Sequence, residues 1–287
     1  MSSLSEQLKP EMLARLGRFP IMAGNAVMGI MSGLHKSISK GSGGDFMQYS
    51  PCTPGDDLRY VDWKLYARQD RLYNKVRNDD TTMKCAIVVD GTASMAYKGS
   101  SSALSKYQYA AILGACFASV ASSQNDNAGV FVLGASGIRR MPFAGRDDVF
   151  PLVNELDNIK PEGKSDILEY LHEIDDFLGH SRGLTFFLSD LIGCDLPSLI
   201  KHFVANSREL HLCHILDRDE VELPFGGTLQ FQDAESNENI VAAPDLVRDA
   251  YKLKMEHWLG EVRNQALEGQ SHYQFATSDA SFWEYFC

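Results

Sequence analysis

The sequence has 287 residues, of which 44% are hydrophobic and 23% are charged, and its formal net charge is −11. This length suits one large α/β domain with extensions or two small domains, and the hydrophobic content is that of an ordinary buried core. The acidic balance argues against a surface that follows the phosphates of a nucleic acid.

Residues 1–40 are predicted to form a helical arm, because apolar residues from Leu4 to Leu16 recur near helical spacing. The arm has no secretory pattern, and its most apolar stretch, residues 20–34, is shorter than the roughly 20 residues that a membrane span needs. The six cysteines contain no C-x-x-C pair, which is typical of reduced thiols in the cytosol. We therefore expect a cytoplasmic protein without a membrane span.

Residues 41–82 are predicted to form a small β extension that follows a glycine-rich break. The stretches 45–50 and 71–78 have the composition of two short strands. Between them, a Pro-Gly turn precedes Asp56, which is a plausible N-cap for a short amphipathic helix.

From residue 83 to residue 287, strand-like and helical segments alternate. Strands are predicted at 85–90, 127–134, 138–145, 183–191, 209–217 and 272–279. Helices are predicted at 105–124, 146–159, 165–179, 196–207 and 245–269, with a hairpin at 227–243 and a closing helical turn at 280–286. This alternation predicts an α/β domain with a mostly parallel sheet and helices on both faces. In such sheets, functional sites lie at the carboxyl ends of the strands.

Two of these strands end in an aspartate beside hydroxyl residues, in the stretches "VVDGTAS" and "FFLSDL". With the loop "KPEGKSDI", they supply five oxygen donors at one edge of the sheet: Asp90, Thr92, Ser94, Ser165 and Asp190. A shell made only of oxygen selects Mg²⁺ or Mn²⁺ over Zn²⁺. Asp90 or Ser94 alone could equally be a helix N-cap. For the five residues together, the metal site is the favoured interpretation.

An enzymatic interpretation competes with this one. Phosphatases of the haloacid dehalogenase type carry a nucleophilic aspartate two positions before a D-G-T motif, and here Val88 stands at that position and cannot attack phosphorus. No phosphate-binding or dinucleotide-binding glycine motif is present. We therefore expect no enzymatic activity, with a Mg²⁺-dependent hydrolase and a metal-free scaffold as the alternatives. His211 and Cys213 share one strand face, but without a third donor they are expected to be core residues rather than a zinc site.

The spacing D-G-T-A-S resembles the D-x-S-x-S motif of von Willebrand factor A domains, where it forms a metal-ion-dependent adhesion site. Asp90 and Ser94 match this motif directly, and Thr92 replaces its first serine with another hydroxyl. The later threonine of that family falls on Ser165 and its second aspartate on Asp190. The resemblance implies a doubly wound, Rossmann-type sheet with a metal site at its carboxyl edge.

The upstream block "GDDLRYVDWKLYARQDRL" closely resembles the bacterial family known as domain of unknown function 58. The matching residues are Gly55, Asp56, Asp57, Arg59, Asp62, Trp63, Ala67, Arg68 and Leu72. The stretch "HILDRDEVELPF" and the final "YQFATSD" also fit, so that the resemblance covers roughly residues 40–287.

Members of that family commonly accompany MoxR-type AAA+ ATPases, and no enzymatic activity is established for them. The resemblance therefore implies a metal-dependent protein-interaction module that works with such an ATPase in assembling or activating other proteins. Asp56, Asp57 and Arg59 are candidate partner-binding residues, with a purely structural network as the alternative. Short acidic runs such as "DRDE" at 217–220 are expected to be solvated.

Overall fold

The computed structural model describes residues 45–51, 65–66, 72–78, 82–100, 102–145, 149–179, 183–236 and 238–280. The chain divides into two compact units, one of residues 24–82 and one of residues 1–23 and 83–287. The predicted helical arm at 1–40, the closing turn after residue 280 and the candidate partner residues Asp56, Asp57 and Arg59 lie outside the described residues.

The smaller unit contains an antiparallel pair of strands, β1 (Asp45–Pro51) and β2 (Tyr73–Asn78). The pairing runs from Asp45 opposite Asn78 to Pro51 opposite Tyr73, with one irregularity after Phe46. Both strands predicted from the sequence in this unit are thus confirmed.

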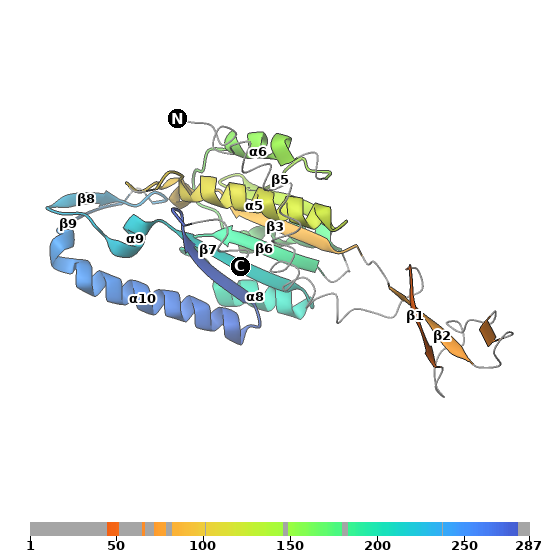
Figure 1. Ribbon diagram of the computed structural model, residues 1–287. Helices are drawn as coiled ribbons and strands as arrows, with labels where there is room; N and C mark the ends of the chain where they lie inside the picture. The colour runs from red at the N-terminus through yellow and green to blue at the C-terminus, as the bar shows by residue number, and fades with distance from the viewer. Residues whose placement is uncertain are drawn as a thin grey trace. The chain divides into compact units, whose positions relative to one another are not determined.

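The larger unit is built on a six-stranded sheet in the order β10-β7-β6-β3-β4-β5 (Figure 1). Its strands are β3 (Lys84–Asp90), β4 (Asn127–Gly134), β5 (Gly137–Arg140), β6 (Gly183–Ser189), β7 (Glu209–Leu216) and β10 (His272–Thr277). Every neighbouring pair is parallel except β4 and β5. The predicted mostly parallel α/β sheet is confirmed, and β3, which ends in Asp90, lies inside it.

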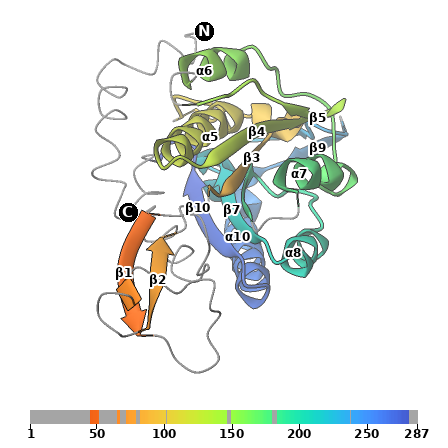
Figure 2. The same ribbon diagram turned by 90° about the vertical axis from the view of Figure 1, so that its right-hand side faces the viewer.

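Helices cover both faces of this sheet (Figure 2). They are η2 (Ala93–Ala96), α5 (Lys106–Ser123), α6 (Val149–Asp157), η4 (Ile167–Tyr170), α7 (Leu171–Leu178), α8 (Leu196–Ala205), α9 (Arg218–Glu222) and α10 (Pro244–Glu268). The helix α5 packs on one face, while α7 and α8 pack on the other. A separate hairpin of β8 (Leu229–Gln232) and β9 (Asn239–Ala242) precedes α10. None of the described helices is both long and apolar enough to cross a bilayer.

Local signals explain where these helices begin. Ser105 caps α5 through a capping box with Gln108, and Pro151 lies in the first turn of α6, where a missing N–H costs no helical hydrogen bond. The segment predicted as one helix at 165–179 instead starts as the 3₁₀ turn η4, because Asp166 caps it by accepting from the Leu168 N–H at 2.9 Å.

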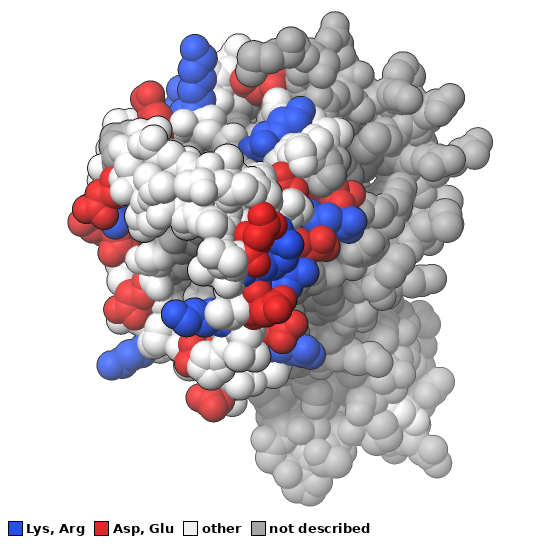
Figure 3. All heavy atoms as spheres, turned by 90° about the vertical axis from the view of Figure 1, so that its left-hand side faces the viewer, with Lys and Arg blue, Asp and Glu red and all other residues white. Residues whose placement is uncertain are grey.

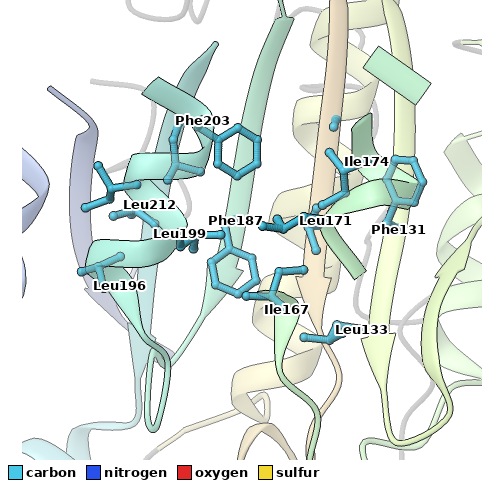
Figure 4. Close-up of a cluster of buried hydrophobic side chains, with 14 of the residues drawn as sticks. Phe131, Leu133, Ile167, Leu171, Ile174, Phe187, Leu196, Leu199, Phe203 and Leu212 are labelled. Carbon is cyan, nitrogen blue, oxygen red and sulfur yellow. The ribbon is translucent and has the colours of Figure 1, made fainter. Parts of the chain in front are cut away.

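The strand β3 is buried on both faces, as its continuous apolar run predicts. On the face that α7 and α8 cover, the core contains residues from β3, β4, β6 and β7 (Figure 4). Leu133, Ile167 and Phe187 mark the end of this core at the carboxyl edge of the sheet, because they also line a cavity there. That cavity contains the candidate site.

Candidate metal centre

Asp90 is the last residue of β3, and its side chain is buried. Its Oδ1 accepts hydrogen bonds from the backbone N–H of Thr92 at 2.9 Å and from Thr92 Oγ1 at 2.8 Å. Its Oδ2 accepts from Ser189 Oγ at 2.6 Å. Asp90 does not cap a helix, because the N-cap of η2 is Thr92. The helix-cap alternative for Asp90 is therefore wrong.

The turn after Asp90 is held tightly against its neighbours. The Gly91 N–H donates to Leu133 O at 2.7 Å, and a Cβ at this position would lie 2.8 Å from the same oxygen, so only glycine fits. The Ala93 N–H donates to Gly163 O at 2.9 Å, and the Glu162 N–H donates to Gly91 O at 3.1 Å. These two bonds fix the loop before η4 against the turn and thereby bring Ser165 to the site.

The site is a small polar cavity of ≈ 90 Å³ that Asp90, Thr92, Ser165 and Ser189 line together with Lys164 and Glu235. Ser94 joins the group through a 3.2 Å hydrogen bond between its Oγ and Thr92 Oγ1. The structure thus brings together four of the five donors that the sequence predicts.

Asp190, the fifth donor, has a different environment. It is buried, its Oδ1 accepts from the Ile192 N–H at 3.1 Å, and its Oδ2 lies 2.8 Å from Lys106 Nζ. Lys106 Nζ is also 2.7 Å from Glu220 Oε1, and its side chain has no exposed surface. Burial favours the neutral amine, but Asp190 and Glu220 outweigh it and raise the pKa of Lys106, which is therefore charged. Both Asp190 oxygens are engaged within the chain.

The electrostatics of Asp90 favour a cation. Burial raises the pKa of Asp90 to about 6, the Asp190 charge adds to this, and the hydrogen bonds from Ser189 and Thr92 oppose it. Within the described part of the chain, no Lys or Arg forms an ion pair with Asp90. A buried carboxylate that lacks a cation, surrounded by hydroxyl oxygens, fits a hard divalent ion such as Mg²⁺.

Sequence reasoning missed Ser189, Lys106, Glu220 and Glu235. Two of them had a detectable signal: Ser189 directly precedes Asp190 in the same strand-end motif, and Lys106 directly follows a helix cap. Glu220 was missed because the run "DRDE" was expected to be solvated. That expectation is wrong, since Asp217 and Asp219 are buried. Nothing local in the sequence indicates that Glu235, which lies in the turn between β8 and β9, reaches this cavity.

A second group of potential ligands lies on β7 and β10. Glu209, His211 and His272 place one ligand atom each within 4.8 Å of one another, so they could hold a metal ion. The expectation that His211 lacks further donors is therefore wrong: Cys213 is not the relevant neighbour, and pairing in the sheet brings His272 opposite His211. The two imidazole rings stack at 4.2 Å, and burial lowers the pKa of His211 to about 3, so this ring is neutral.

A family model described as "Protein of unknown function DUF58" matches residues 48–257. The chain belongs to this family. Its DUF58 sequence is also 24% identical over 231 residues to uncharacterized proteins of Mycobacterium tuberculosis and Mycobacterium bovis, covering 79% of this chain and 72% of each relative.

Two solved structures have a similar arrangement. A conserved hypothetical protein BatB from Bacteroides thetaiotaomicron aligns with 71% of this DUF58 chain and 93% of its own, with 14% identity and a TM-score of 0.47. The SpRpn10 VWA domain aligns with 72% of this chain and 94% of its own, with 12% identity and a TM-score of 0.40.

Proposed function

We propose that this DUF58 protein is a non-enzymatic interaction module in which Mg²⁺ or Mn²⁺ at the Asp90 site helps to bind a carboxylate of a partner protein. One observation carries the proposal. Asp90 is a buried carboxylate that no described cation neutralises, and it faces a cavity lined by hydroxyl groups. Such a group is costly to keep ionised unless a cation joins it.

Asp90, Thr92, Ser94 and Ser165 would hold the ion. Asp190 would act through water, because Lys106 and the Ile192 N–H already occupy its oxygens. When bound, the ion supplies positive charge to an incoming carboxylate. The chain positions the donors through the Gly91 turn, and the apolar floor of Leu133, Ile167 and Phe187 limits the entry of water.

One carboxylate contact at an exposed ion is too weak to specify a partner, so the surrounding surface must contribute. Beside the hairpin lies an apolar groove of ≈ 680 Å³, lined mainly by Tyr97, Leu223, Phe225, Leu229, Phe231, Ile240, Val247 and Tyr251. Further apolar side chains are exposed nearby, with Val241 67% and Leu246 86% exposed. On this side of the molecule, acidic and basic residues are interspersed among uncharged ones (Figure 3). The surface therefore favours a partner that combines apolar groups with an acidic residue.

The partner class comes from the family resemblance: a MoxR-type AAA+ ATPase or its client, met in the cytoplasm. Asp56, Asp57 and Arg59 remain candidates for a second contact with it.

A Mg²⁺-dependent hydrolase is the second candidate function, and Glu235 is the observation that favours it. This carboxylate lines the cavity, and burial raises its pKa, as suits a general base. Incubation with phosphate esters, ATP and nucleic acids, with Asp90→Asn and Glu235→Gln as controls, separates the two functions. We expect background rates for all three proteins. Turnover that both substitutions remove would establish the hydrolase.

The interaction module is tested by calorimetric titration with Mg²⁺ and Mn²⁺. Wild type should bind one ion, Asp90→Asn should not, and the exposed-site control Asp249→Asn should bind like wild type. A purified MoxR-type ATPase should then bind wild type in Mg²⁺ and lose affinity both in chelator and with Asp90→Asn. Equal metal binding by wild type and Asp90→Asn would overturn the site.

A further inference from the structure

The turn of the β8–β9 hairpin brings a further acidic side chain to the Asp90 site. Glu235 lines the same cavity as Asp90, Thr92 and Ser165, and its side chain is only 15% exposed although it lies in a turn. Its carboxylate accepts a hydrogen bond from the side chain of Ser94. Glu235, which lies 141 positions after Ser94 in the sequence, thus contacts one of the four clustered donors.

The hairpin is built to hold Glu235 in this place. Asp233 Oδ1 accepts from the backbone N–H of Glu235 at 2.7 Å and from that of Ser236 at 2.9 Å. The Asp233 N–H donates to Glu238 O at 2.8 Å and closes the turn. Because this geometry fixes the backbone, the Glu235 carboxylate reaches the site with little remaining freedom to lose on binding an ion.

The charged residues near Glu235 do not compensate for the burial of its carboxylate in the cavity. Its ion pair with Lys164 spans 3.9 Å, and the Lys164 side chain is 73% exposed, so water screens the attraction. Burial raises the pKa of Glu235; the charge of Lys164 opposes this without cancelling it, and the charge of Asp190 adds to the increase. The residues that line the cavity include three carboxylates, Asp90, Asp166 and Glu235, and one ammonium group, Lys164, so their formal charge is −2. One divalent cation neutralises this charge.

We propose that Glu235 is the chain's own carboxylate ligand for the ion at the Asp90 site, and that a partner's acidic residue must displace it. This inference rests on the proposed function. It assigns the hairpin a regulatory role, because Glu235 holds the position that an incoming carboxylate needs. The hairpin also forms part of the apolar groove, where Phe231 of β8 packs against Phe225 with their ring centroids 5.9 Å apart. A partner that fills the groove can therefore shift the hairpin and release Glu235.

The experiment uses Mn²⁺ alone, followed by acetate as the carboxylate probe, on the full chain. Glu235→Gln keeps the shape of the side chain and removes its charge, and Glu238→Gln is the matched control on the same hairpin. We expect Glu235→Gln to weaken Mn²⁺ binding about tenfold, because the charge of the ligands sets the affinity of such sites. Water-proton relaxation should show one more water on Mn²⁺ in Glu235→Gln, and acetate should displace that water at a lower concentration than in wild type. Glu238→Gln should match wild type in all three measurements.

Two outcomes separate the inference from the function on which it rests. If wild type binds no Mn²⁺, the proposed function fails and the inference fails with it. If wild type binds Mn²⁺, and Glu235→Gln has the same affinity, hydration and acetate response, then Glu235 is not a ligand and the proposed function stands. Glu235→Asp, which keeps the charge but shortens the side chain, guards against a folding effect: it should have intermediate affinity with an unchanged thermal melt.

Discussion

Asp90 and Asp217 occupy equivalent places in the fold but have opposite electrostatic environments. Asp90 ends β3 and Asp217 directly follows β7, so both lie at the carboxyl edge of the same parallel sheet, and both are buried. Burial raises the pKa of Asp217 too, but hydrogen bonds from Ser102, the Asp219 N–H, Ser278 and the Gly99 N–H outweigh it and lower the pKa overall. The pKa of Asp90 is raised to about 6.

The difference lies in the donors that the rest of the chain supplies. Asp217 Oδ2 accepts from Ser102 Oγ at 2.6 Å, Ser278 Oγ at 2.7 Å and the Gly99 N–H at 3.0 Å, and its Oδ1 accepts from the Asp219 N–H at 2.9 Å. These donors tie the loop after η2 and the end of β10 to β7. Asp90 accepts hydrogen bonds from three donor groups, which belong to Thr92 and Ser189. The Asp190 carboxylate is close enough to raise the pKa of Asp90, and the Asp90 side chain lines the site cavity. A buried aspartate at a strand end thus has a structural role where hydrogen-bond donors of the chain fully satisfy its oxygens. Where they do not, the carboxylate is available to a ligand.

The largest effect should follow from breaking the saturated aspartate. Asp217→Ala leaves two hydroxyls and two N–H groups without their acceptor, and we expect it to lower the free energy of unfolding by about 4 kcal/mol or more. Urea unfolding in chelator measures this change. The exposed control Asp249→Ala should lie within about 0.5 kcal/mol of wild type. A loss for Asp217→Ala no larger than for the control would remove the distinction between the two aspartates.

A somewhat smaller loss should follow from removing the buried ammonium beside the site. Lys106→Met leaves Asp190 and Glu220 without their cation, and breaking such a pair typically costs about 3–4 kcal/mol. Adding Asp190→Asn to Lys106→Met removes one of the unpaired charges and should recover part of the loss. If the double variant is no more stable than Lys106→Met, the ion pair with Asp190 is not the source of the effect.

Asp90 should respond in the opposite direction to Asp217. In metal-free protein at pH 7, Asp90→Asn removes a buried charge whose pKa is about 2 units above its usual value, so we expect stability to rise by about 1–3 kcal/mol. The same substitution should abolish the extra stability that Mg²⁺ gives to wild type. His211→Phe, which alters the other potential metal group, should leave the Mg²⁺ effect intact. A less stable Asp90→Asn protein in chelator would show that the chain already satisfies this carboxylate.

Much of the sheet and part of the site could be read from the sequence. The apolar run from Cys85 to Val89 and the hydroxyl residues after Asp90 are local patterns. These patterns predicted the strand β3 and the gathering of oxygen donors at the carboxyl edge of the sheet. The environment of Asp190 could not be predicted, because Lys106 reaches it from a helix 84 positions earlier. Glu235 was missed for the same reason: its hairpin has an ordinary turn sequence, and only tertiary packing brings it to the cavity. The burial of Asp217 depends on Ser102 and Ser278, which are distant in sequence from it and from each other.

The smallest effect, a change in the slope of stability with pH, sharpens the comparison most. Asp90 has a folded-state pKa of about 6 against an ordinary 3.8, so its contribution to stability grows as the pH falls from about 6 toward 4, at about 1.4 kcal/mol per pH unit. The contributions of His211 and His214 to stability have the opposite pH dependence and decrease as the pH falls. Burial lowers their pKa values to about 3 and about 4 from an ordinary 6.5, so the unfolded chain takes up protons in this range that the folded chain does not.

Together, the two histidines and Asp90 lower the stability of the metal-free protein by about 1.4 kcal/mol per pH unit as the pH falls from 6 to about 4.5. Glu220 and Glu235, whose pKa values burial also raises, act in the same direction as Asp90. Asp217 adds nothing in this window, because its pKa lies below its ordinary value and it stays ionised in both states. Asp90→Asn removes one opposing contribution, so stability should fall with decreasing pH more steeply than in wild type by about 1.4 kcal/mol per pH unit, whereas His211→Phe should make the fall shallower by about the same amount. Urea unfolding in chelator at four pH values measures all three slopes. If Asp90→Asn keeps the wild-type slope, Asp90 does not titrate near pH 6, and its contrast with Asp217 disappears.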